Sequence, residues 1–141
     1  MELLCSDLAG DLDDLAHLLD GSPLVVFAHN VECVPRLDSI VRDPRASFEQ
    51  SLSILREAKR LRPDMLTKSS LMVGVGETDE EIVEAMHLLR DAGVDLITIG
   101  QYLAPSKNHL AIDRFPEPEL YDVWAKKAIE MGFSGVVSGP L

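Results

Sequence analysis

The feature that most constrains this sequence is the alternation of extended apolar segments with amphipathic helical segments along its whole length. Extended segments are predicted at residues 2–5, 24–28, 65–75, 94–99 and 133–137. Each is separated from the next by a stretch with apolar residues at helical spacing. Strands that alternate with helices pair in parallel through right-handed crossovers. The chain is therefore predicted to be an α/β protein forming a single domain over residues 1–141, with parallel strands and crossover helices.

Local signals predict where the helices begin, where they end and which side faces inward. Thr78 and Glu81 form a capping box, and Asp43 is expected to cap a helix that has Pro44 at its first position and ends before Pro63. Pro118 opens the last helix. The inward faces are expected to carry Leu12, Leu15, Ala16 and Leu19; Phe48, Leu52 and Leu55; Ile82, Met86 and Leu89; and Leu120, Val123, Trp124, Ala128 and Met131.

Two sheet architectures fit this pattern, a doubly wound sheet and a portion of a (β/α) barrel. A complete (β/α) barrel takes about 250 residues, and this chain has 141. Five strands would form part of a barrel and would leave two unpaired sheet edges. Such edges predict that the isolated chain aggregates or binds a partner.

Composition excludes several classes of protein. The net charge of −11, with basic residues dominating only at residues 36–62, makes nucleic acid a poor partner. No apolar run approaches the roughly 18 residues that span a bilayer, so no membrane association is expected. Residues 1–20 carry six acids and no Lys or Arg, which is unlike a targeting peptide. With only Cys5 and Cys33, neither a disulfide nor a protein-bound metal is predicted.

Polar and glycine residues follow three consecutive predicted strands, where parallel α/β folds place their sites. Asn30 and Glu32 could bind the hydroxyl groups of a ribose, and paired glycines let a flat ring approach the backbone. A nucleoside-binding site is therefore predicted at this edge of the sheet. Its residues are Asn30, Glu32, Gly74, Gly76, Glu77, Gln101 and Tyr102.

Each of these signals also has a structural explanation. The glycines could form a tight turn before the capping box, and Glu32 and Glu77 could be solvated loop acids. His29 is expected to be a hydrogen-bonded residue at the rim, not a ligand. Lys68 could meet an anion or extend to solvent, and His109 could contact substrate or lie on the surface.

Six segments of the sequence resemble lipoyl synthase in order and spacing. They lie at residues 30–37, 41–46, 67–69, 71–78, 98–103 and 138–141. Within them, residues 70–77 resemble the G-x-I-x-G-x-x-E segment that packs against the adenine of S-adenosylmethionine (SAM) in the radical SAM superfamily, with Ser70 in place of the first glycine. The resemblance implies a portion of a (β/α) radical SAM partial TIM barrel. Asn30 and Glu32 match positions that contact the ribose.

The resemblance also implies an activity, cofactors and partners. Lipoyl synthases use SAM and two [4Fe-4S] clusters to insert two sulfur atoms into octanoyl groups on lipoyl-carrier domains or glycine cleavage H protein, with ferredoxin or flavodoxin as electron donor. The chain resembles the carboxyl-terminal part and contains none of the family's cluster ligands, so alone it is expected to hold no cluster and to be inactive. It would be cytoplasmic if bacterial, and mitochondrial or plastidic if eukaryotic. A non-catalytic remnant and an unrelated nucleotide-binding barrel are the alternatives.

Overall fold

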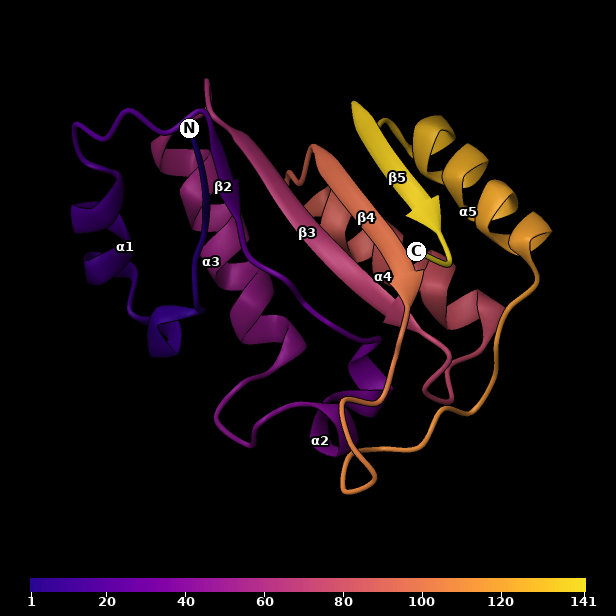
Figure 1. Cartoon of the computed structure of the whole chain (residues 1–141). Coiled ribbons are helices and arrows are strands. Elements are labelled where there is room, and N and C mark those ends of the chain that lie inside the picture. Colours follow the sequence, from indigo (N-terminus) through magenta and orange to yellow (C-terminus); the bar gives the residue numbers. More distant parts are fainter.

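The computed structural model describes residues 1–141 and contains one five-stranded sheet (Figure 1). All four neighbouring pairs of strands are parallel, and the spatial order β1-β2-β3-β4-β5 follows the chain. The strands are β1 (Glu2–Leu4), β2 (Val26–Ala28), β3 (Leu66–Val73), β4 (Leu96–Gln101) and β5 (Gly135–Gly139). The predicted α/β fold with parallel strands is confirmed. A strand order that never reverses is that of a partial (β/α) barrel, not of a doubly wound sheet.

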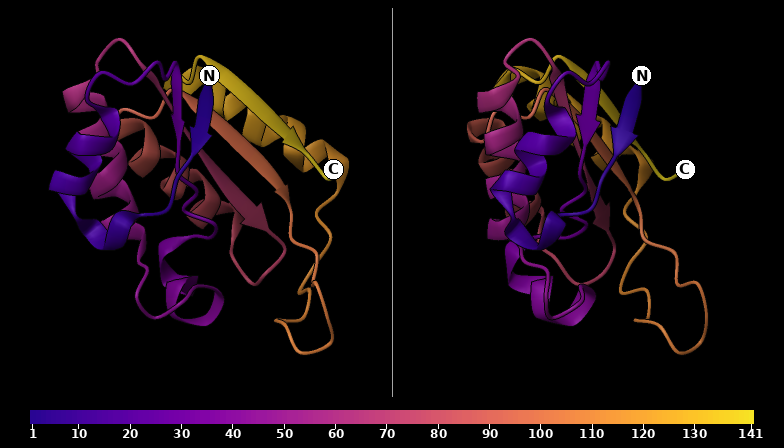
Figure 2. Two further views of the ribbon diagram at one scale, coloured as in Figure 1. Left: turned by 60° about the vertical axis from the view of Figure 1, so that its left-hand side comes forward. Right: turned by 90° about the vertical axis from the view of Figure 1, so that its left-hand side faces the viewer.

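The helices cover one face of this sheet and leave the other open, as the two side views show (Figure 2). The α-helices are α1 (Leu12–Leu19), α2 (Asp38–Val41), α3 (Phe48–Leu61), α4 (Asp79–Asp91) and α5 (Pro118–Met131), with 3-10 turns η1 (Leu8–Gly10) and η2 (Pro35–Leu37). None of these helices is both long and apolar enough to cross a membrane.

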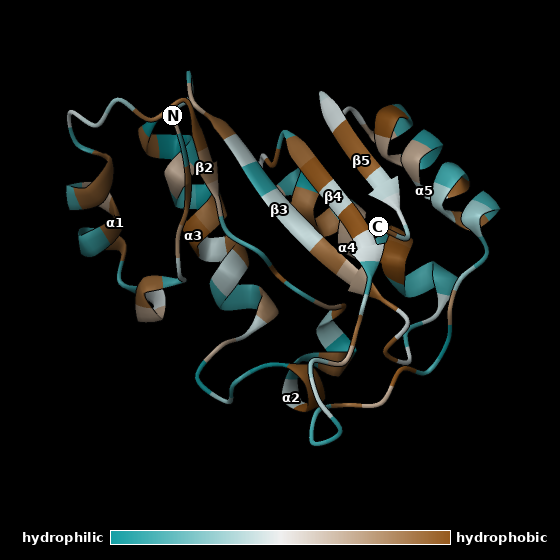
Figure 3. Cartoon of the chain, viewed as in Figure 1, coloured by the Kyte–Doolittle hydropathy of each residue, from teal (hydrophilic) through white to brown (hydrophobic).

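The core lies between the sheet and the helices. Burial alternates along β3, where Thr67, Ser69, Leu71 and Val73 are buried and the residues between them are half-exposed. Buried apolar side chains from the strands and the covering helices form one continuous cluster. The strands carry much of the apolar character, whereas the helices are mixed (Figure 3). Both outer strands, β1 and β5, have one unpaired edge.

The start of α3 differs from the prediction. The helix begins at Phe48, and Ser47 caps it by accepting a hydrogen bond from the Gln50 backbone N–H at 3.1 Å. The predicted cap, Asp43, instead accepts hydrogen bonds from the backbone and the guanidinium of Arg45. Because the carboxylate is used in this local turn, the chain continues past Pro44 before the helix starts.

The inward face of α5 is also rotated from the predicted one. Tyr121, Trp124 and Ala128 are buried, whereas Val123 is 46% exposed. The rings of Tyr121 and Trp124 pack edge to face with centroids 5.1 Å apart. This aromatic pair sets which side of the helix meets the sheet. The capping box of α4 and its buried stripe are as predicted, and Gly132, in the left-handed conformation, ends α5.

Replacing Trp124 by alanine is expected to lower the free energy of unfolding by about 3–5 kcal/mol, because the side chain is almost fully buried and would leave a cavity. Val123→Ala, one residue away on the exposed side, is expected to change it by less than ~0.5 kcal/mol. Urea denaturation of both variants measures the difference. Equal losses would show that α5 packs through a different face.

Candidate functional site

A cavity of about 390 Å³ opens at the carboxyl ends of β1 and β2. Asn30 and Glu32, two of the predicted site residues, line it. Neither side chain forms a hydrogen bond within the protein, so both are available to a ligand. The other lining residues are Leu4, Cys5, Ser6, Asp7, His29, Arg42 and Ala46.

Backbone hydrogen bonds to β3 hold Glu32 in place. Its N–H donates to the Ser70 carbonyl at 3.1 Å, and its carbonyl accepts from the Met72 N–H at 2.7 Å. The residue has a φ of 68°, a left-handed conformation that is uncommon outside glycine. The loop after β2 is therefore bonded to the neighbouring strand, and this holds the backbone of Glu32 at the cavity.

His29 is a structural residue of the cavity wall, as predicted. Its Nδ1 lies 3.0 Å from the Cys5 carbonyl oxygen and its Nε2 lies 2.7 Å from Ser51 Oγ. Burial lowers the pKa of His29, which favours the neutral ring. A neutral ring can donate from Nδ1 to the carbonyl and accept the Ser51 hydroxyl proton at Nε2.

Arg42 is a cavity residue that was not among the predicted site residues. Its side chain is only 7% exposed, and Nη2 donates to Ser51 Oγ at 2.9 Å. The other terminal nitrogen, Nη1, has no hydrogen-bond partner and lies 3.8 Å from the Asp38 carboxylate. Because Nη1 is itself buried and faces Asp38, Arg42 is a structural part of the cavity wall that holds Ser51. The signals in the sequence are its place in the one basic segment and in residues 41–46, one of the six segments that resemble lipoyl synthase.

The turn at residues 74–77 follows β3 and is organised by Glu77. Its side chain is 1% exposed; Oε1 accepts the Gly74 N–H at 2.8 Å and Oε2 accepts the Val75 N–H at 3.0 Å. Glu77 is thus neither a solvated acid nor a free ligand contact. Its carboxylate holds the turn.

The same turn presents free backbone groups. Gly76 has a φ of 120°, and a Cβ at this position would meet no atom within 4 Å. The N–H groups of Gly76 and Glu77 have no acceptor within the chain. An open glycine with two unused donors allows close approach by a flat ligand with hydrogen-bond acceptors.

The side chains of Gln101 and Tyr102 form hydrogen bonds within the protein and do not line the cavity. The Gln101 amide donates to the backbone carbonyls of Val73, Tyr102 and Arg114 at 3.0–3.3 Å, and the Tyr102 hydroxyl donates to the Leu110 carbonyl at 2.9 Å. These bonds fasten the long loop after β4 beside the 74–77 turn.

Arg114, from the same loop, contacts the carboxylates of Asp79 at 2.9 Å and Glu77 at 3.4 Å. The seven predicted residues therefore do not line a single cavity. Asn30 and Glu32 lie in the cavity, and the other five belong to the neighbouring turn and its supports.

Lys68 and His109 lie away from these two groups. Lys68 forms a 2.8 Å ion pair with Glu2, and by the alternation of burial along β3 it lies on the uncovered face of the sheet. His109 Nδ1 lies 2.8 Å from Ser106 Oγ in the exposed loop after β4. Their roles toward an anion or a substrate stay predictions.

The residues of this chain do not fit an iron–sulfur cluster. No group of three or more His, Cys, Asp or Glu side chains is placed to bind a metal ion. Cys5 and Cys33 are free thiols. Burial, aided by the nearby Asp38 carboxylate, raises the pKa of Cys33 to about 12, which disfavours the thiolate that ligates iron.

A family model for the radical SAM superfamily matches residues 1–89, which include both the cavity and the 74–77 turn. The chain belongs to the radical SAM superfamily.

Individual relatives that match the chain are similar to it over its whole length and share one name, lipoyl synthase. Over all 141 residues the chain is 53% identical to lipoyl synthase of Halorhodospira halophila, 51% to a chloroplastic lipoyl synthase of Arabidopsis thaliana and 48% to a mitochondrial one of Arthroderma otae. It covers 42%, 36% and 34% of those proteins, respectively. The likeness to lipoyl synthase found in the sequence is confirmed over the whole chain.

The two turn glycines are expected to respond differently to alanine. Gly76→Ala should lower the free energy of unfolding by about 1–2 kcal/mol, the cost of a side chain in left-handed backbone. Gly74→Ala should cost about 1–3 kcal/mol more, because its Cβ would overlap Gln101 Nε2 and the Arg114 carbonyl oxygen. Chemical denaturation measures both values. A larger loss at Gly76 would contradict the packing described for this turn.

Proposed function

We propose that this radical SAM chain is the nucleoside-binding part of a lipoyl synthase, which inserts two sulfur atoms into protein-bound octanoyl groups. One juxtaposition supports this best. The free side chains of Asn30 and Glu32 lie at the carboxyl edge of the sheet, one strand away from the open 74–77 turn. The 48–53% identity to lipoyl synthases supports the choice of reaction.

The donor set at this edge fits SAM. The Asn30 amide and the Glu32 carboxylate are suited to the vicinal hydroxyls of a ribose, and the 74–77 turn is suited to a flat base. SAM, when bound, supplies the radical chemistry needed at unactivated C–H bonds.

The remaining predicted residues act by holding this edge in shape. Glu77 and Gly74 organise the turn, and Gln101 and Tyr102 fasten the loop after β4 beside it. No step through an iron–sulfur cluster is assigned to residues 1–141, because their side chains do not form a ligand set. The chain spans about a third to two-fifths of its curated relatives, so the activity belongs to the complete enzyme.

The partners follow from the proposed reaction. They are octanoylated lipoyl domains or glycine cleavage H protein as acceptors of sulfur, and a ferredoxin or flavodoxin as electron donor. Curated relatives include chloroplastic, mitochondrial and bacterial proteins. The compartment is accordingly proposed to be the cytoplasm in a bacterium and an organelle in a eukaryote.

A chimera tests the reaction. Residues 1–141 would replace the matching segment of the Halorhodospira halophila lipoyl synthase, to which they are 53% identical. The reconstituted chimera is expected to convert an octanoylated lipoyl domain to its lipoylated form, detected by the mass of the domain. A folded chimera with full cluster content and no product would favour the alternative, a non-catalytic remnant.

Two substitutions in that chimera test the nucleoside site. Asn30→Ala should weaken SAM binding by about 1–3 kcal/mol through the loss of a ribose hydrogen bond, and Gly76→Val should block approach of the base. Calorimetry measures binding, and iron content should stay unchanged. Ser53→Ala, on α3, serves as a control that should bind normally. Normal SAM binding by either site variant would refute the assignment of that residue.

A further inference from the structure

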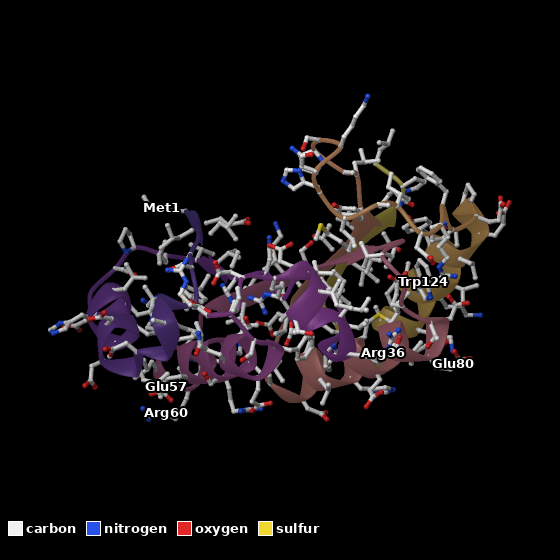
Figure 4. The ribbon with its side chains drawn as sticks, turned by 90° about the horizontal axis from the view of Figure 1, so that it is seen from below. Met1, Arg36, Glu57, Arg60, Glu80 and Trp124 are labelled. Carbon is white, nitrogen blue, oxygen red and sulfur yellow. The ribbon has the colours of Figure 1, made fainter.

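Arg36 joins the loop after β2 to the turn after β3. It lies in η2, and its Nε and Nη2 form a two-point ion pair with the Glu81 carboxylate at 2.6 and 3.0 Å. The same Nη2 donates to the Gly76 carbonyl oxygen at 2.8 Å. Figure 4 shows Arg36 next to the start of α4, where Glu80 is labelled.

This contact differs from an ordinary surface ion pair. Arg36 is 54% exposed, and exposed pairs contribute only about 0–1 kcal/mol to stability. Arg60 forms a similar two-point pair with Glu57 at 2.6 and 2.8 Å, within α3 and far from the site (Figure 4). Of these two pairs, Arg36–Glu81 alone also holds a backbone carbonyl of the 74–77 turn.

Glu81 anchors Arg36 to a rigid element. Its Oε2 also accepts the Thr78 backbone N–H at 2.9 Å, as part of the capping box of α4. The Arg36 guanidinium, together with this N–H, lowers the pKa of Glu81 to about 2. The pair is therefore ionised at neutral pH.

The carbonyl of Gly76 and the N–H of Glu77 belong to one planar peptide and point in opposite directions. Holding the carbonyl therefore sets the direction of the free Glu77 N–H. Glycine has access to more backbone conformations than any other residue, so without a contact this peptide could rotate.

We propose that Arg36 is a positioning residue that orients the Gly76–Glu77 peptide, so that the Glu77 N–H can donate to a ring acceptor of the bound nucleoside. The proposal rests on the proposed function for the identity of the ligand. It adds a physical link between the ribose side of the site, on the loop after β2, and the base side, on the 74–77 turn.

Backbone order in the ligand-free chimera tests the first half of the proposal. In Arg36→Gln, ¹⁵N order parameters at Gly76 and Glu77 should fall from about 0.85, typical of rigid backbone, toward 0.6. Glu81→Gln keeps the capping hydrogen bond but removes the charge, and it should have the same effect. Arg60→Gln should leave these values unchanged. The urea midpoint, measured for all variants, should stay near that of the wild type.

SAM affinity in the chimera tests the second half. Arg36→Gln should weaken binding about fivefold to tenfold, and Arg36→Lys, which cannot span both partners, should weaken it less. The Arg36→Gln/Glu81→Gln double variant should bind SAM no more weakly than the single variants, because each single substitution already breaks the same Arg36–Glu81 contact. Arg60→Gln should bind normally.

The outcomes separate this proposal from the proposed function. Unchanged order parameters in Arg36→Gln would overturn the positioning role whatever the ligand. Lost order with unchanged SAM affinity would overturn the link to ligand binding. If the unsubstituted chimera fails to bind SAM, the proposed function fails, and the order parameters still decide whether Arg36 orients the peptide.

Discussion

The carboxylate of Glu77 is the interaction on which the candidate site depends. A buried carboxylate is costly unless hydrogen bonds and charges compensate it. Here two backbone N–H groups of the same turn and the guanidinium of Arg114 supply that compensation. Because both oxygens are used internally, the turn closes on itself and leaves the next two N–H groups free. The sequence suggests Glu77 as a ligand contact. In the structure Glu77 instead supports the turn whose free N–H groups could contact a ligand.

Two arginines connect elements that are distant in the sequence around this turn. Arg36 comes from the loop after β2 and Arg114 from the loop after β4, and they reach the turn from its two sides. Arg42 lies in the cavity wall, where it supports Ser51 and, through it, His29. In a strongly acidic chain these cations therefore concentrate where loops must be held together. Electrostatics here organises the site more than it stabilises the fold.

The parallel sheet brings these parts to one edge. Each crossover returns the chain to the same end of the sheet, so successive strands finish side by side (Figure 1). The cavity lies after β1 and β2, and the turn lies after β3. A ligand that uses both must be long enough to cross from one strand end to the next. A nucleoside, with a sugar at one end and a base at the other, meets that requirement.

The sequence by itself determined the α/β class, the parallel strands, the capping box of α4 and the likeness to lipoyl synthase, because these depend on local periodicity and on residue identity. Only the tertiary structure decided the strand order, the Ser47 cap, the rotation of α5, the holding role of Glu77 and the cavity position of Arg42. Each of these is settled by competition among partners. The Asp43 carboxylate accepts hydrogen bonds from Arg45, the Trp124 ring packs against Tyr121, and the Gln101 amide donates to three backbone carbonyls. Residue patterns indicate which groups need a partner, and the folded structure determines which partner, near or distant in the sequence, each one has.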